Sequence, residues 1–121
     1  MPWEFSNDKP IFQQLIEMIS ADIATGKYAP GERLDSVRDL AVSAGVNPNT
    51  MQRALSQLEQ TGLLYTKRGA GRFVSENAGQ AKRALDSLVR RKTGEYVDAV
   101  TALGLTKQQV RQALERELEE R

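Results

Sequence analysis

The sequence contains neither cysteine nor histidine. The absence of cysteine excludes disulfides and thiolate chemistry, which is consistent with a reducing compartment. The absence of histidine removes the commonest general base and the commonest metal ligand. The remaining carboxylate, serine, lysine and tyrosine residues form no recognisable catalytic constellation. We therefore expect a protein that is not an enzyme and that holds neither a metal ion nor a cofactor.

Long apolar runs are missing as well. No stretch approaches the roughly 20 residues that a membrane-spanning helix needs. The N-terminal segment, MPWEFSNDKP, lacks the basic and apolar stretches of a signal peptide. These absences predict a cytoplasmic protein without a membrane partner. The 121 residues fit one domain, or a small domain with an appendage, and a hydrophobic content of 40% supports one modest core.

Positive charge is concentrated in the middle of the chain. The net charge of the whole sequence is only +1. By contrast, the segment from Thr25 to Ser75 holds seven basic and four acidic residues, a local excess of +3. The middle third is therefore the basic part of the chain, and the motifs described next lie mostly within it.

Hydrophobic spacing and capping residues predict two helices in the first part of the chain. Apolar residues recur at helical spacing over about Pro10–Ala24. Pro30 and Gly31 then suit the two central positions of a type II turn. A second helix is expected after Ser36, which is followed by Asp39 in a pattern resembling a capping box, and it should end at a glycine.

A third helix follows after a few residues. Asn47 can cap it and Pro48 suits its first position. Four apolar residues spaced by three and four form a stripe that we expect to be buried: Met51, Ala54, Leu55 and Leu58. Two short helices joined by about four residues that include a glycine match the helix-turn-helix pattern.

The stretch LLYTKRGAGRFVSE predicts a β-hairpin directly after these helices. Leu63–Thr66 and Arg72–Val74 favour strands, and Gly69 and Gly71 permit a turn with positive φ. Three basic residues surround its tip: Lys67, Arg68 and Arg72. The expected fold is thus mainly α with a small β-hairpin, a winged helix-turn-helix.

The polar residues of the third helix suit the reading of DNA. If the apolar stripe faces inward, Asn49, Gln52 and Arg53 face outward, and Asn47 and Thr50 flank the helix start. The N-terminal residues of such a helix meet base edges in the major groove, where asparagine and glutamine pair with adenine and arginine pairs with guanine. The helix N-terminus also attracts phosphate.

Each of these features has a plainer interpretation. Asn-Pro at a helix start is often only a cap, and a glutamine-rich surface is often only solvated. The charges of the hairpin could serve solubility alone. Arg38 could contact phosphate, or it could form an ion pair within its own helix with Asp35 or Asp39.

The segment Pro10–Val74 resembles the winged helix-turn-helix domain of GntR-family bacterial transcription regulators. The resemblance is carried by PGERLDSVRDLA, NTMQRAL, LEQTGLL and RGAGRFV. Asp35 departs from the family pattern, which usually has proline there, and Asn47-Pro48 replaces a common Ser-Arg. However, VNPNT and the short tail are similar to the YtrA-type subfamily. The resemblance and the residues together predict these DNA contacts: Arg38, Asn47, Asn49, Thr50, Gln52, Arg53, Lys67, Arg68, Gly69 and Arg72.

The residues after the hairpin predict a helical dimerisation tail. From about Asn77 an apolar stripe runs along one expected helix, interrupted at Lys92 and Gly94, which leaves a break or kink open. Thr106 can cap a last helix. Two amphipathic helices cannot bury a core alone, so we expect them to pair with a second copy rather than fold back on their own domain. The stripe residues expected to mediate dimerisation are Leu85, Leu88, Val89, Tyr96, Val100, Leu103, Val110 and Leu114.

The expected organisation is a DNA-binding domain over residues 1–76 and a two-helix dimerisation tail over residues 77–121. A twofold dimer would place its recognition helices about 34–36 Å apart on an inverted-repeat operator in double-stranded DNA. The resulting hypothesis is a homodimeric transcription repressor. The alternative is a winged-helix module that contacts a protein or RNA. Whether a small-molecule effector also binds is left open.

Overall fold

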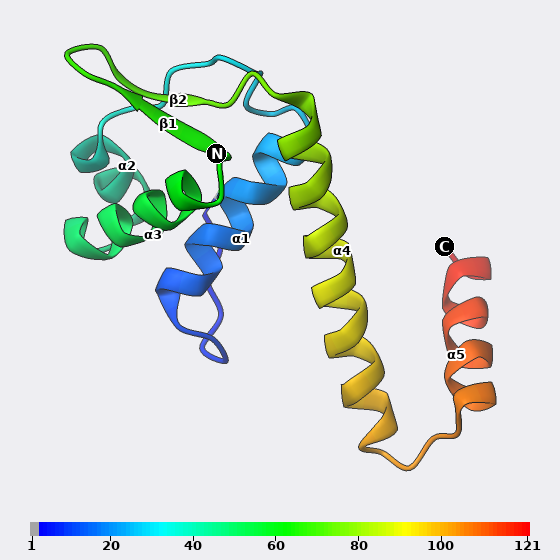
Figure 1. The fold of residues 1–121 in the computed structure, drawn as a ribbon. Helices are drawn as coiled ribbons and strands as arrows, with labels where there is room; N and C mark the ends of the chain where they lie inside the picture. Colours follow the sequence, from blue (N-terminus) through cyan, green and yellow to red (C-terminus); the bar gives the residue numbers. More distant parts are fainter. Residues whose placement is uncertain (1–2) are drawn as a thin grey trace. The chain divides into compact units, whose positions relative to one another are not determined.

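The computed structural model describes residues 3–121 and contains these elements in chain order (Figure 1): α1 (Ile11–Ala24), α2 (Val37–Ala44), α3 (Pro48–Gln60), β1 (Leu64–Lys67), β2 (Gly71–Val74), α4 (Ala78–Thr101) and α5 (Lys107–Glu119). The chain divides into two compact units between Leu88 and Val89, within α4. This division differs from the expected boundary at residue 76, and each unit is described by itself. No helix within residues 3–121 is long and apolar enough to span a membrane.

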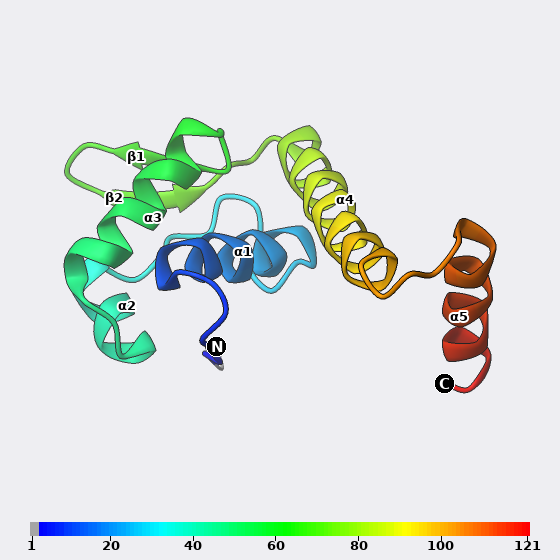
Figure 2. The same ribbon diagram turned by 90° about the horizontal axis from the view of Figure 1, so that it is seen from below.

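The first unit is built around the recognition helix candidate, α3. This helix packs against α1, α2 and β1 (Figure 2). Its four stripe residues, Met51, Ala54, Leu55 and Leu58, are buried, as their spacing predicted. They meet apolar side chains from the neighbouring elements: Leu15, Ile19, Leu40, Leu63 and Val74. One apolar cluster therefore fixes how α3 lies on the unit and which of its faces stays in solvent.

Local capping signals set the helix boundaries. The Asn47 side chain accepts a hydrogen bond from the Asn49 amide at 2.7 Å, and Pro48 is the first residue of α3. The Ser36 hydroxyl accepts from the Asp39 amide at 3.1 Å at the start of α2. Gly45 ends α2 with φ +70°, a conformation that glycine adopts without steric cost. The predicted caps at Ser36 and Asn47 are thus confirmed, although the Asp39 side chain does not complete a capping box at Ser36.

The β-hairpin is held by a third extended segment. Strands β1 and β2 pair antiparallel, with Leu64 opposite Val74. The Leu34 amide donates to the Arg72 carbonyl at 2.9 Å, and the Gly31 amide donates to the Val74 carbonyl at 2.9 Å. The segment Gly31–Leu34, which includes the end of the turn at Glu32, therefore pairs through its backbone with β2. β1 begins and ends one residue later than predicted, and β2 begins one residue earlier, because pairing follows the register of both strands.

The second unit consists of the end of α4 and all of α5. Helix α4 continues through Lys92 and Gly94, so the break left open by the sequence does not occur. Thr106 caps α5 in a complete capping box with Gln109. Within residues 89–121 no side chain is buried, and Leu103 retains 77% of its accessible surface.

Candidate nucleic-acid interface

The exposed face of α3 begins at its N-terminus. Asn47, Asn49, Gln52 and Arg53 are exposed, and Thr50 is half-buried. Because the opposite face of the helix is closed by the core, these side chains point to solvent. In the first turn Pro48 has no N–H and the Asn49 amide donates to the Asn47 cap. The positive end of the helix dipole lies at the same place. This end of the helix can therefore bind a phosphate or present donors and acceptors to base edges.

Two neighbouring residues of this face are held by different partners. The Gln52 amide nitrogen donates to the Ser56 hydroxyl at 3.1 Å, one helical turn further along. The Arg53 guanidinium lies 4.5 Å from the ring centroid of Phe12, on α1, in a cation–π contact. Both side chains keep exposed polar atoms but have fewer rotamers to lose on binding.

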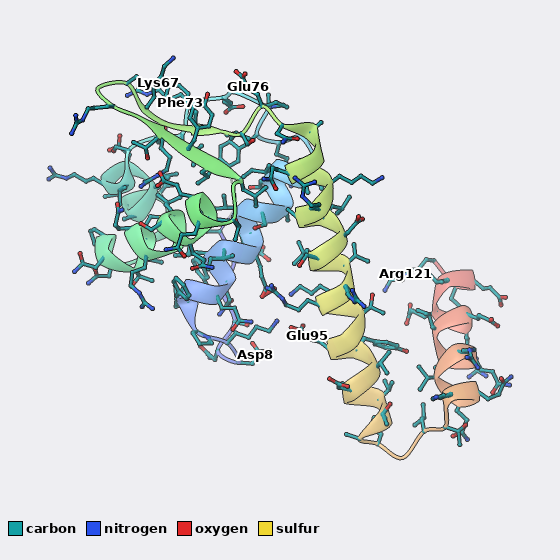
Figure 3. All side chains as sticks on the ribbon, in the orientation of Figure 1. Asp8, Lys67, Phe73, Glu76, Glu95 and Arg121 are labelled. Carbon is teal, nitrogen blue, oxygen red and sulfur yellow. The ribbon has the colours of Figure 1, made fainter. Side chains whose placement is uncertain are left out.

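The hairpin forms the basic wing. Lys67 and Arg68 are exposed at its turn, and Lys67 projects outward from the hairpin (Figure 3). Gly69 and Gly71 have φ of +80° and +117°, so the tight turn depends on glycine. Tyr65 and Phe73 stack across the two strands with ring centroids 5.6 Å apart. The stacked pair stiffens the strands that carry the basic tip.

Arg72 lies in a different environment from Lys67 and Arg68. Its Nε atom donates to the Glu59 carboxylate at 2.7 Å, and only 16% of its side chain is exposed. Thr66, opposite Arg72 in the strand register, donates to the same carboxylate oxygen. Burial acts to raise the pKa of Glu59, but hydrogen bonds from Arg72 and Thr66 and the Arg72 charge outweigh it, so the pKa lies below its usual value.

Two further basic residues flank these elements. Arg38 on α2 is exposed, and within residues 3–121 no salt bridge joins it to Asp35 or Asp39. Arg33 is also exposed, and a Cβ atom built on Gly71 would lie 2.9 Å from its Nε. Arg33 is thus a basic neighbour of the wing in addition to Lys67, Arg68 and Arg72.

The sequence did not indicate which residues the predicted DNA contacts pack against. Phe12, Arg33 and Glu59 come from a helix, a turn and the far end of α3. Neither periodicity nor a capping pattern links them to Arg53, Gly71 or Arg72, because they meet only through tertiary packing.

The residues predicted to mediate dimerisation are only partly covered within the chain. Leu88, Val100 and Val110 are half-buried. The others are exposed: Leu85, Val89, Tyr96, Leu103 and Leu114. Helices α4 and α5 contain no buried residue. Most of the predicted stripe is therefore exposed to solvent within a single chain.

Helix pair, recognition face and basic hairpin together define the class of winged helix-turn-helix DNA-binding proteins. The sequence profile of "Bacterial regulatory proteins, gntR family" matches residues 11–74, more than half of the chain. The chain therefore belongs to the GntR family of bacterial transcription regulators, as the resemblance predicted.

Relatives and solved structures agree with this assignment. The uncharacterised regulator YhcF of Bacillus subtilis is 36% identical over 107 residues, 88% of each chain. The transcriptional repressor YtrA of Bacillus subtilis is 42% identical over 69 residues, 57% of this chain and 53% of its own length. A GntR-family regulator from Listeria monocytogenes superimposes with a TM-score of 0.81 at 33% identity, over 93% of this chain and 98% of its own.

A further solved structure contains DNA. The AraR DNA-binding domain in complex with the operator ORX1 matches with a TM-score of 0.57 at 30% identity, over 62% of this chain and 96% of its own. The predicted fold class, mainly α with a winged helix-turn-helix, is confirmed. The family is one of transcription regulators and not a class of enzymes.

Proposed function

We propose that this protein is a homodimeric transcription repressor that binds an inverted-repeat operator in the cytoplasm. The observation that supports it most is the exposed N-terminal face of α3 beside a basic wing. The similarity to a DNA-binding domain solved in complex with its operator supports the binding of operator DNA. Similarity to a named repressor supports repression rather than activation.

The chemistry of each side chain suggests whether it contacts a base or a phosphate. Asn49 and Gln52 carry both a donor and an acceptor and suit the edge of adenine, whereas Arg53 suits guanine or a phosphate. Asn47 and Thr50 lie at the helix start, where hydroxyl, amide and backbone N–H groups suit phosphate. Arg38, Lys67 and Arg68 would contact the backbone, with Gly69 allowing close approach, and these contacts would be salt-dependent.

The tail would supply the dimer contact. Two amphipathic helices with no buried residue gain little stability from their own packing. Pairing the apolar faces of two copies would remove this surface from water and set the spacing of the two recognition helices. Residues 77–121 are accordingly the proposed dimerisation tail, although α4 begins in the first unit.

DNA binding is tested with a duplex selected by the intact chain from a random-sequence library. With roughly 6–10 phosphate contacts per dimer, affinity should fall about 10³–10⁵-fold between 50 and 200 mM salt. The selected site should be an inverted repeat. Selection of no duplex, or equal affinity for an RNA hairpin of matched length, would favour the protein- or RNA-binding alternative.

Dimerisation is tested by analytical ultracentrifugation of the full chain and two variants. Leu114→Glu places a charge on the apolar face of α5, and Gln112→Glu places one on the opposite, polar face as a matched control. Because Leu114 is exposed within the chain, its substitution should leave helicity intact. We expect a monomer for Leu114→Glu and a dimer for Gln112→Glu. A wild-type monomer at micromolar concentration would refute the proposal.

A further inference from the structure

The ion pair between Glu59 and Arg72 joins the recognition helix to the wing. Glu59 lies in the last turn of α3, and its carboxylate accepts hydrogen bonds from Thr66 on β1 and Arg72 on β2. Thr66 and Arg72 face each other in the strand register, so one carboxylate oxygen holds both strands at the same level of the hairpin. The Glu59 side chain is 29% exposed, so the pair is partly shielded from water.

Arg72 is fixed at its backbone as well. Its carbonyl accepts from the Leu34 amide at 2.9 Å, on the side of β2 away from β1. A side chain anchored through Nε and a carbonyl bonded to the Leu34 amide leave Arg72 little freedom to follow a phosphate. By contrast, Lys67 and Arg68 lie exposed at the turn.

We propose that Glu59 and Arg72 are a positioning pair, which sets the angle of the wing to the recognition helix without either residue contacting DNA. The inference rests on the proposed DNA-binding function and reassigns Arg72 from a phosphate contact to a brace. The physical reason is geometric. The recognition helix would contact the bases while the wing contacts the DNA backbone. If the ion pair already fixes the wing relative to α3 in the free protein, less conformational entropy is lost on binding DNA.

A carboxylate near a DNA-binding surface would otherwise oppose binding. An unpaired Glu59 would repel phosphate, whereas the Arg72 guanidinium neutralises it. The two explanations for Arg72 therefore predict opposite effects of Glu59→Gln. If Arg72 is a brace, loss of the carboxylate loosens the wing and weakens binding. If Arg72 is a phosphate contact restrained by Glu59, loss of the carboxylate frees it and binding stays equal or strengthens.

The first measurement follows the wing directly and needs no DNA. Because the chain has no cysteine, spin labels can be placed at Ala70→Cys on the wing turn and Val42→Cys on α2, both exposed positions. Labelled chain is diluted with unlabelled chain so that each particle carries one labelled pair. The distance distribution should be narrow in the parent, broader in Glu59→Gln and Arg72→Gln, and narrower again in Glu59→Asp, which retains the charge.

The second measurement uses the duplex selected by the intact chain from a random library. Glu59→Gln and Arg72→Gln should each lower affinity roughly three- to tenfold, and the double variant should be no weaker than either single one. The double variant Glu59→Gln/Arg72→Gln, which leaves no unpaired charge, should keep the slope of log affinity against log salt. The control Arg68→Gln should reduce that slope by about 1.8, about 0.9 for each subunit of the dimer.

The outcomes separate this inference from the proposed function. An unchanged distance distribution in both single variants overturns the brace. A salt slope that falls by about 1.8 in the double variant Glu59→Gln/Arg72→Gln also overturns it. If the intact chain selects no duplex, the proposed function fails, but a broadened distribution in Glu59→Gln still supports the brace.

Discussion

Asn47 offers a direct test of which end of α3 approaches DNA. Its side chain caps the helix through the Asn49 amide at 2.7 Å and is exposed. Aspartate caps a helix as well as asparagine does and interacts favourably with the helix dipole. Asn47→Asp should therefore keep the stability of the fold. Asn47→Ala removes the cap and should lower the free energy of unfolding by about 1 kcal/mol.

Although Asn47→Asp should keep the stability of the fold, it should lower the affinity for DNA. If the N-terminus of α3 meets the duplex, the new carboxylate lies near phosphate. At about 8 Å and an effective dielectric constant of about 20, the repulsion is roughly 2 kcal/mol, which screening at 0.1 M salt reduces to about 1 kcal/mol. Asn47→Asp should thus weaken binding roughly fivefold for each nearby phosphate.

Gln60→Glu is the matched control because it adds the same charge at the other end of α3. The 13 residues of this helix extend about 20 Å, beyond the screening length of about 10 Å at 0.1 M salt. Its effect on affinity should be below about twofold. Affinity is measured by fluorescence anisotropy and stability by urea unfolding. Equal losses of affinity for Asn47→Asp and Gln60→Glu would refute the end-first orientation of α3.

Three further predictions concern the first unit, which carries α3 and the wing. Leu55→Ala removes a fully buried side chain and should lower the free energy of unfolding by about 2–5 kcal/mol, measured by urea unfolding; a loss below about 1 kcal/mol would contradict its central place in the core. Burial, and then nearby carboxylates, raises the pKa of Tyr28. The stability that this gives is complete below the unfolded pKa of about 10 and is lost as pH rises through the folded value. In Tyr28→Phe the melting temperature should therefore fall less steeply with pH above pH 10 than in the parent. An unchanged dependence of melting temperature on pH would show that other groups cause this fall. Gly71→Ala should weaken DNA binding and lower the melting temperature, because φ is +117° and the new Cβ would lie 2.9 Å from Arg33 Nε; a variant with parent-like melting and affinity would rule out the strained turn.

The local parts of the fold were predictable from sequence because their causes are local. A cap, a proline at the first helical position and a glycine with positive φ each act within a few residues, so Asn47, Pro48 and Gly45 fixed helix ends correctly. The apolar spacing of α3 likewise identified its buried face. The break left open at Gly94 did not occur, since one glycine in a long helix costs only about 1 kcal/mol.

The sequence by itself determined the helix ends, the hairpin, the polar face of α3 and the apolar stripe of the tail. Only the tertiary structure decided which partners these residues have. Arg72 looked like another basic residue of the wing, yet it is paired with Glu59, and Arg53 lies over Phe12 of another helix. The physical reason is that a capping bond or a helical stripe depends on neighbours in the chain. An ion pair or a cation–π contact depends on how separate elements pack against one core.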